Sequence, residues 1–225
     1  PTAGGKTEAA SFPVFSRMLS ENWDGLSVLY ICPIKALLNN LEHRLSNYGH
    51  LLGRSVALWH GDISAARKAK IIASPPDILL TTPESLEVML VSNKVDQQQL
   101  FANVRTVIID EVHAVAGTKR GAHLALSLER LEQVTMQPFQ RIGLSATQKP
   151  LEEVARLLGG FDDNGQQRPV AIVDAGARKP LDLAVEMPDP SLTEGDSGGF
   201  DGAHFSAEEG TRRARPESPL HRTIV

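Results

Sequence analysis

The chain has 225 residues, of which 41% are hydrophobic and 22% charged, and this composition excludes a fibrous or wholly disordered protein. Its formal net charge of −4 excludes a general basic footprint for nucleic acid, so any such binding has to rest on local clusters. The single cysteine, Cys32, excludes a disulfide framework, and no apolar run approaches the ~20 residues that span a bilayer, so we expect a cytoplasmic protein.

Short apolar runs alternate with amphipathic segments through most of the chain. In chain order, strands are expected at 27–32, 55–59, 77–82, 104–111, 141–146 and 170–174. The helices between them are expected at 35–48, 64–73, 84–91, 121–134 and 150–158. The strand runs lack period-2 alternation, which indicates strands buried on both faces, and their alternation with helices indicates right-handed crossovers. The sequence therefore predicts an α/β protein of three layers built on a mostly parallel sheet.

The ordered domain is expected to end near residue 187. Residues 189–219 are rich in Gly, Ser, Pro, Glu and Asp and poor in apolar side chains. Such a segment buries too little surface to offset the entropy lost on ordering. We therefore predict one domain over residues 1–187 and a disordered linker or tail over residues 188–225.

The first residues carry the end of a phosphate-binding loop. Gly5-Lys6-Thr7 matches the end of the pattern G-x-x-x-x-G-K-[ST], whose first glycine would fall one residue before Pro1. We therefore expect the domain to lack the strand that precedes this loop. Gly4 and Gly5 would let backbone N–H groups face a phosphate, Lys6 would reach the β- and γ-phosphates, and Thr7 would coordinate Mg²⁺. Taken alone, the half motif is equally compatible with a glycine-rich turn.

Two carboxylates follow the fourth expected strand. Asp110 and Glu111 end the apolar run 107–109, and ligands of open α/β sheets bind at the carboxyl ends of strands. Asp110 suits a Mg²⁺-bound position, and Glu111 is placed to orient or deprotonate an attacking water. Ser145 and Thr147 follow the fifth expected strand in the same way. The alternatives are a strand that ends in solvated acids and an ordinary capping turn. With the phosphate loop upstream, the two features together predict an ATPase.

The motif order GGKT, PIKALLNNLEHR, TTPESL, DEVH, SAT resembles that of a superfamily-two helicase. Three stretches resemble the large helicase-related (Lhr-type) proteins in particular. They are DEVHAVAGTKRGAHLALSLERL at 110–131, RIGLSATQKPL at 141–151 and VDAGARKPLDL at 173–183. The resemblance covers residues 1–187.

This resemblance implies an ATP-dependent DNA helicase that moves 3′ to 5′ on single-stranded DNA by means of two RecA-like domains, of which this chain is the first. ATP and Mg²⁺ are the implied cofactors, bound through Gly4, Gly5, Lys6 and Thr7, with Asp110 on the metal and Glu111 in hydrolysis. The resemblance also implies that His113, Ser145 and Thr147 couple hydrolysis to strand movement. Because the implied second domain supplies an arginine to the reaction, we expect the isolated chain to hydrolyse ATP hardly at all.

Two further stretches, 33–37 and 81–85, match motifs that contact the nucleic-acid strand in this family. The candidate contacts are Pro33, Lys35, Thr81, Thr82, Lys119 and Arg120. Hydroxyls, backbone N–H groups and helix N-termini hold phosphates without reading a base sequence. For the two lysines and the arginine, ordinary solvated charge is an equal alternative. Two other hypotheses stay open: a P-loop ATPase that does not act on nucleic acid, and an inert partial product.

Overall fold

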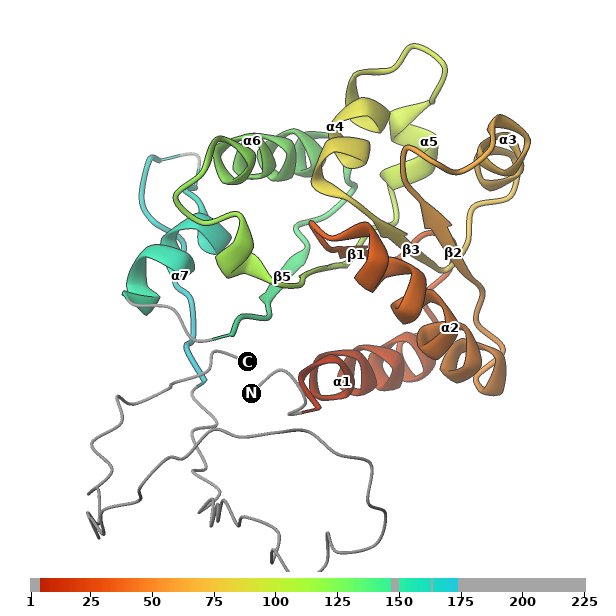
Figure 1. Ribbon diagram of the computed structural model, residues 1–225, viewed down its shortest axis with the longest axis horizontal. Coiled ribbons are helices and arrows are strands. Elements are labelled where there is room, and N and C mark those ends of the chain that lie inside the picture. The colour runs from red at the N-terminus through yellow and green to blue at the C-terminus, as the bar shows by residue number, and fades with distance from the viewer. Residues whose placement is uncertain (1–4, 147–149, 163, 174–225) are drawn as a thin grey trace, which may run out of the picture. The chain divides into compact units, whose positions relative to one another are not determined.

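The computed structural model describes residues 5–146, 150–162 and 164–173. Its centre is a five-stranded sheet in the order β2-β3-β1-β4-β5, parallel at every pairing (Figure 1). The strands are β1 Val28–Ile31, β2 Val56–Trp59, β3 Ile78–Thr81, β4 Thr106–Ile109 and β5 Gln140–Gly143. Because every strand runs in the same direction, all five carboxyl ends meet at one edge. The predicted parallel α/β fold is confirmed.

Helices cover both faces of this sheet. Their bounds are α1 Lys6–Ser20, α2 Lys35–Leu51, α3 Ala65–Ala73, α4 Pro83–Val91, α5 Gln97–Phe101, α6 Lys119–Val134 and α7 Leu151–Gly159, with a 3₁₀ turn η1 at Val112–Ala114. On one face, α1 and α2 pack against alternate strand residues; on the other, α4, α5, α6 and α7 pack against the residues between them. The three predicted layers are therefore present.

Strand β1 shows why the strands are apolar throughout. Val28 and Tyr30 belong to the core under α1 and α2, whereas Leu29 and Ile31 belong to the core under α4 and α6. All four side chains are at most 2% exposed. A strand that is buried on both faces has no position at which a solvated polar residue is favoured, so the period-2 signal disappears.

The expected sixth strand at 170–174 is wrong for its described residues, since 170–173 form no strand. Val170, Ala171 and Ile172 instead line a hollow of about 530 Å³, together with residues of α1, β5 and α7. A strand needs a hydrogen-bonded neighbour, and within the described part of the chain β5 pairs only with β4. Helix α5 was not expected; Asp96 caps it by accepting a hydrogen bond from the Gln99 N–H. The predicted tail at 188–225 lies outside the described residues.

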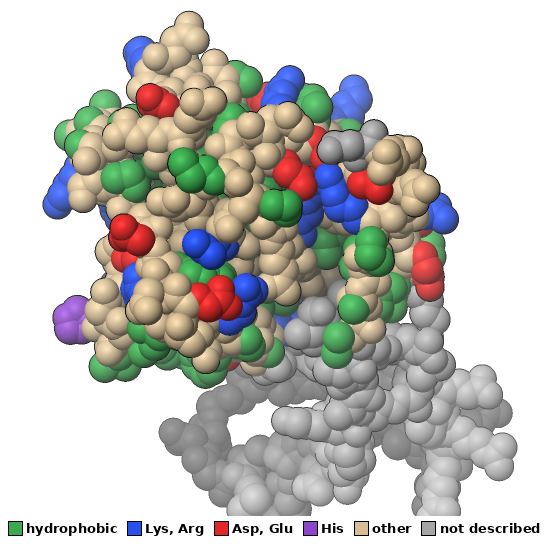
Figure 2. All heavy atoms as spheres, turned by 180° about the vertical axis from the view of Figure 1, so that it is seen from behind, with side chains coloured by type: hydrophobic (Ala, Val, Ile, Leu, Met, Phe, Trp, Pro, Cys, Tyr) green, Lys and Arg blue, Asp and Glu red, His purple; other side chains and the backbone are tan. Residues whose placement is uncertain are grey.

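The surface carries mixed charge on the face that Figure 2 shows, where Lys and Arg side chains are interspersed with Asp and Glu. This agrees with the formal net charge of −4. Among the described helices, none is both long enough and apolar enough to cross a membrane.

Candidate nucleotide-binding and hydrolysis site

The chain turns sharply where it leaves β4. Glu111 has φ 51° and ψ 41°, the left-handed region that side chains with a Cβ adopt rarely. The turn is held on both sides, because the Asp110 N–H donates to the Ile31 carbonyl at 2.8 Å and the Val112 N–H donates to the Leu144 carbonyl at 3.0 Å. Strained backbone of this kind concentrates at functional sites. Here it points two successive carboxylates in different directions from one strand end.

Asp110 is a buried carboxylate with both oxygens hydrogen-bonded. Asp110 is 7% exposed. Oδ2 accepts from the Tyr30 hydroxyl at 2.8 Å, and Oδ1 accepts from the Glu111 N–H at 2.9 Å. Burial first, and then the charge and hydrogen bond of Asp110, raise the pKa of Tyr30. The Tyr30 hydroxyl therefore joins β1 to the carboxylate at the end of β4.

Lys6 is the first residue of α1. Its Nζ atom is buried and has no hydrogen-bond partner among the described residues. Gly5 before it has φ 70°, which favours glycine and lets the loop turn into the helix. Glu8, one turn into α1, accepts hydrogen bonds from Arg44 and Tyr48 of α2, and Arg44 lowers the pKa of this carboxylate. The first turn of α1 is thereby fixed on α2.

These groups fit a metal-bound polyphosphate. A buried ammonium without a partner and the N-terminus of a helix both favour an anion, and an anionic ligand would satisfy both. No cluster of three or more His, Cys, Asp or Glu side chains suited to a metal occurs in the described ranges. A divalent cation would therefore take the Thr7 and Asp110 oxygens together with phosphate and water oxygens, as Mg²⁺ usually does. Gly4 lies outside the described residues.

His113 connects the acidic turn to the end of β5. Its Nδ1 accepts from the Ala146 N–H at 3.2 Å, so in the neutral ring the proton is on Nε2. Nε2 lies 3.2 Å from Glu111 Oε2 and donates to it. Ser145, which is 1% exposed, places its hydroxyl 3.4 Å from His113 Nδ1. The structure thus brings together three of the predicted hydrolysis and coupling residues. Thr147 is not among the described residues.

The candidate strand-contacting residues lie at the same edge of the sheet, and several of their polar groups are already paired. Lys35 donates to Asp62 at 2.9 Å, and the Thr81 hydroxyl donates to the Trp59 carbonyl at 2.8 Å. Thr82 caps α4 by accepting from the Ser85 N–H at 3.2 Å. The buried threonine hydroxyls therefore shape the ends of β2 and β3. Their contact with a nucleic acid stays a prediction.

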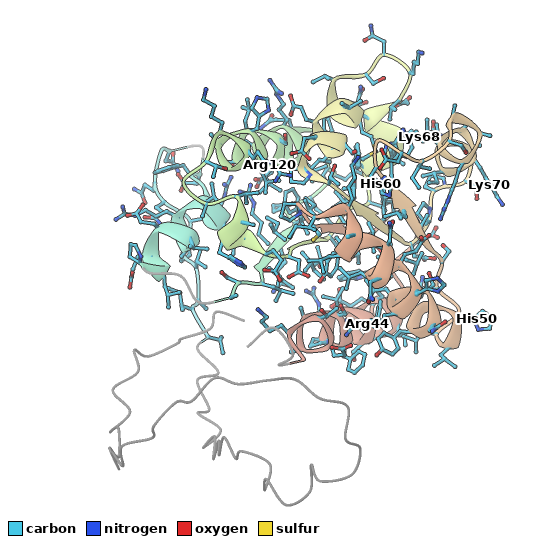
Figure 3. All side chains as sticks on the ribbon, in the orientation of Figure 1. Arg44, His50, His60, Lys68, Lys70 and Arg120 are labelled. Atoms are coloured by element: carbon cyan, nitrogen blue, oxygen red, sulfur yellow. The ribbon has the colours of Figure 1, made fainter. Side chains whose placement is uncertain are left out.

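Arg120, which is labelled in Figure 3, lies at the start of α6 and contacts both predicted strand-contacting stretches. Its Nε donates to Glu84 Oε1 at 2.7 Å and its Nη2 donates to the Pro33 carbonyl at 3.0 Å. Lys119 beside it is exposed. One guanidinium therefore contacts the segment after β1 and the first turn of α4, which hold residues 33–37 and 81–85. The sequence indicated that Arg120 is near this edge but did not indicate these partners.

Tyr30 contacts the candidate site through Asp110, and the sequence analysis did not single it out. It lies in the middle of an apolar run, which predicts only a buried strand. The available signal was a polar hydroxyl at the one aromatic position of that strand, directly before its last residue. That signal alone could not identify the partner, which is 80 residues away in sequence.

A parallel α/β fold of three layers, with the Gly-Lys-Thr end of a phosphate-binding loop at the start of α1 and a buried aspartate at the carboxyl edge of the sheet, defines a RecA-like P-loop ATPase domain. The family model that matches the chain is the DEAD/DEAH box helicase, over residues 1–155. The chain therefore belongs to the DEAD/DEAH box helicase family, as its motif order predicted.

Several relatives are helicases named Lhr. The Mycolicibacterium smegmatis "Lhr helicase/ probable uracil glycosylase" is 45% identical over 212 residues, which are 88% of this chain and 14% of that protein. The Escherichia coli "Lhr helicase/uracil glycosylase" is 40% identical over 209 residues, or 84% of this chain and 13% of that protein. The "ATP-dependent helicase Lhr-Core" of Methanothermobacter thermautotrophicus is 38% identical over 212 residues, or 87% and 24%. The chain thus spans less than a quarter of each of these relatives.

Solved structures agree with this assignment. The helicase Lhr of Mycobacterium smegmatis, solved with single-stranded DNA and AMP-PNP, matches with a TM-score of 0.68 and 44% identity over 88% of this chain and 26% of that chain. The DEAD-box helicase Mss116 shares the fold at a TM-score of 0.62 and 16% identity, over 73% of this chain and 33% of that chain.

Proposed function

We propose that this chain is the ATP-binding domain of an ATP-dependent helicase that moves 3′ to 5′ on single-stranded DNA. The observations that carry this proposal are the buried Asp110 carboxylate, held by Tyr30 at the end of β4, and the buried Lys6 amine at the start of α1, where the sequence matches a phosphate-binding loop. The similar Lhr protein of known structure was solved with single-stranded DNA and a nucleotide analogue, which supports the same two ligands here. The domain would extend over residues 1–187, with 188–225 as a linker or tail, in a cytoplasmic protein.

In the proposed reaction, Lys6 binds the β- and γ-phosphates and the first turn of α1 receives them. Mg²⁺, when bound through Thr7 and Asp110, would neutralise charge on the phosphates. Glu111 Oε2 accepts from His113, so its Oε1 is the oxygen left to orient the attacking water and take its proton. Hydrolysis would be completed by a second RecA-like domain that contributes an arginine.

Coupling would pass through His113. Any displacement of the Glu111 carboxylate changes its contact with His113 Nε2, and the opposite ring nitrogen is held by the Ala146 N–H at the end of β5. Ser145 and Thr147 follow the same strand and are the proposed receivers. On the nucleic-acid side, we propose that segments 33–37 and 81–85 hold strand phosphates, with Lys35 and Lys119 as cationic contacts. Arg120 holds the two segments together.

The test measures ligand binding by the 225-residue chain with AMP-PNP, Mg²⁺ and a labelled single-stranded DNA. We expect Mg-AMP-PNP to raise the melting temperature, because a ligand that binds only the folded state stabilises it by mass action. Glu111→Gln is expected to keep this shift, since Glu111 acts on water rather than on the nucleotide. Asp110→Asn is expected to reduce the shift when Mg²⁺ is present.

Two outcomes would contradict the proposal. A wild-type chain whose melting temperature does not respond to Mg-AMP-PNP is not a nucleotide-binding domain and favours the inert partial product. Nucleotide binding without any detectable affinity for single-stranded DNA would favour the alternative, a P-loop ATPase that does not act on nucleic acid.

A further inference from the structure

We propose that Tyr30 is a positioning residue for the divalent-cation site, whose hydroxyl holds the Asp110 carboxylate in the orientation that binds the cation. This inference rests on the proposed nucleotide-binding function. The carrying observation is the 2.8 Å hydrogen bond from the Tyr30 hydroxyl to Asp110 Oδ2. It joins two side chains that are 1% and 7% exposed.

The sheet register explains how Tyr30 reaches Asp110. Tyr30 on β1 is directly opposite Ile108 on β4. Ile108 and Asp110 are two residues apart on one strand and its end, so both side chains lie on the face that carries Tyr30. A tyrosine ring is long enough to extend along the neighbouring strand from Ile108 to Asp110. The geometry is therefore set by the pairing of the two central strands.

The ring itself is immobilised by the core. Tyr30 packs with Val14 and Met18 of α1, Leu38 of α2 and Ile108 of β4 in one cluster of buried residues. Its hydroxyl can change position only if this cluster repacks, which close-packed interiors resist. A hydrogen bond from such a fixed donor holds the carboxylate more firmly than a water molecule or a mobile side chain would.

Both Asp110 oxygens accept one hydrogen bond each, so each keeps a lone pair for a cation. Tyr30 thus orients the Asp110 carboxylate, which is one of the two predicted cation ligands. Partners that orient metal ligands are typically worth ~10–100-fold in metal affinity.

The test is Tyr30→Phe, which keeps the ring and removes only the hydroxyl. The measurement is the Mg²⁺ concentration that half-saturates binding of a fluorescent ADP analogue, compared with binding of the same analogue in EDTA. We expect the half-saturating Mg²⁺ concentration to rise by roughly 10-fold or more while Mg²⁺-free binding stays unchanged. A merely structural role would alter both measurements together.

The chain offers a matched control, because its other tyrosine is Tyr48. The Tyr48 hydroxyl donates to Glu8 Oε1 at 3.3 Å and does not touch Asp110. Tyr48→Phe removes the same atom, and Arg44 still holds Glu8, so the Mg²⁺ dependence is expected to stay unchanged. Wild-type Mg²⁺ dependence in Tyr30→Phe would overturn the inference on its own. Failure of the wild-type chain to bind the ADP analogue at all would instead overturn the proposed function and this inference with it.

A second measurement keeps the inference testable if Tyr30→Phe does not fold. In the Tyr48→Phe variant, Tyr30 is the one tyrosine in the sequence, so a tyrosine Cζ label produces one NMR resonance. We expect this resonance to shift when Mg²⁺ is added to the nucleotide complex, because cation binding changes the charge on the oxygen that Tyr30 contacts. A resonance that does not respond to Mg²⁺ would overturn the inference.

Discussion

Replacing the buried amine of Lys6 is expected to raise the stability of the domain and to weaken its nucleotide binding. Lys6→Met replaces the ammonium group with an apolar side chain of similar length and flexibility. The wild-type Nζ atom is buried without a hydrogen-bond partner among the described residues. Removing it should therefore stabilise the ligand-free domain and weaken its response to nucleotide.

The size of the effect follows from the cost of an unpaired buried polar group, which is about 1–3 kcal/mol. In a domain of about 150–250 residues, each kcal/mol changes the melting temperature by about 2–4 °C. A ligand at 100 times its dissociation constant adds about 2.7 kcal/mol of stability. Without nucleotide, the Lys6→Met chain should therefore be more stable than the wild type. With nucleotide, it should gain little of the stability that binding adds to the wild type.

The assay is urea unfolding with and without Mg-AMP-PNP, at a nucleotide concentration that saturates the wild-type chain. Lys70→Met is the matched control, because Lys70 is an exposed residue of α3, away from α1 (Figure 3). Exposed substitutions are usually within about ±0.5 kcal/mol. If Lys6→Met destabilises the ligand-free chain, the Lys6 amine has a partner in solution and the reasoning is refuted. An undiminished nucleotide response would refute its role in phosphate binding.

Two further predictions concern titratable groups. Burial raises the pKa of Asp77, but hydrogen bonds from Ser55 and Arg54 outweigh burial, and the net pKa is lowered. A carboxylate whose pKa is lower in the folded state than in the unfolded state stabilises the folded state. This contribution is fully present above the unfolded-state pKa of about 3.9 and is lost as the pH falls through the folded-state pKa. The wild type should therefore have a higher free energy of unfolding than Asp77→Asn near neutral pH, and this difference should shrink below about pH 4. A difference that does not depend on pH would contradict this. Burial also raises the pKa of Cys32 to about 12. Iodoacetamide at about pH 8 should therefore label the native thiol far more slowly than the unfolded one, and comparable rates would contradict its burial.

Local patterns were sufficient to predict the parallel sheet and the edge that carries the site. The central strands are largely apolar runs, which is the pattern of a strand between two helix layers, and this interpretation is confirmed for β1, β3 and β4. The polar motifs each follow such a run. Parallel strands end at a common edge of the sheet. The positions of Asp110 and Thr82 at the ends of two such strands were therefore enough to predict that both residues lie at this edge.

The expected strand at 170–174 was wrong for its described residues because an apolar run does not show whether a pairing neighbour is present. An apolar run indicates that a segment can be buried, but a strand also requires a neighbouring strand with unpaired backbone N–H and C=O groups. Residues 170–173 line the hollow beside β5 without pairing with it. Composition alone cannot distinguish these two ways of contacting a sheet.

The sequence by itself determined the fold class, the family and the residue types of the site, because these depend on local periodicity and on motifs of a few residues. Only the tertiary structure decided which side chains meet: Tyr30 with Asp110, Arg120 with Pro33 and Glu84, and His113 with both Glu111 and Ala146. The physical reason is the strand order β2-β3-β1-β4-β5, which places β1 beside β4 although β2 and β3 lie between them along the chain. Contacts across that pairing depend on register and packing between distant segments, and no local pattern records either.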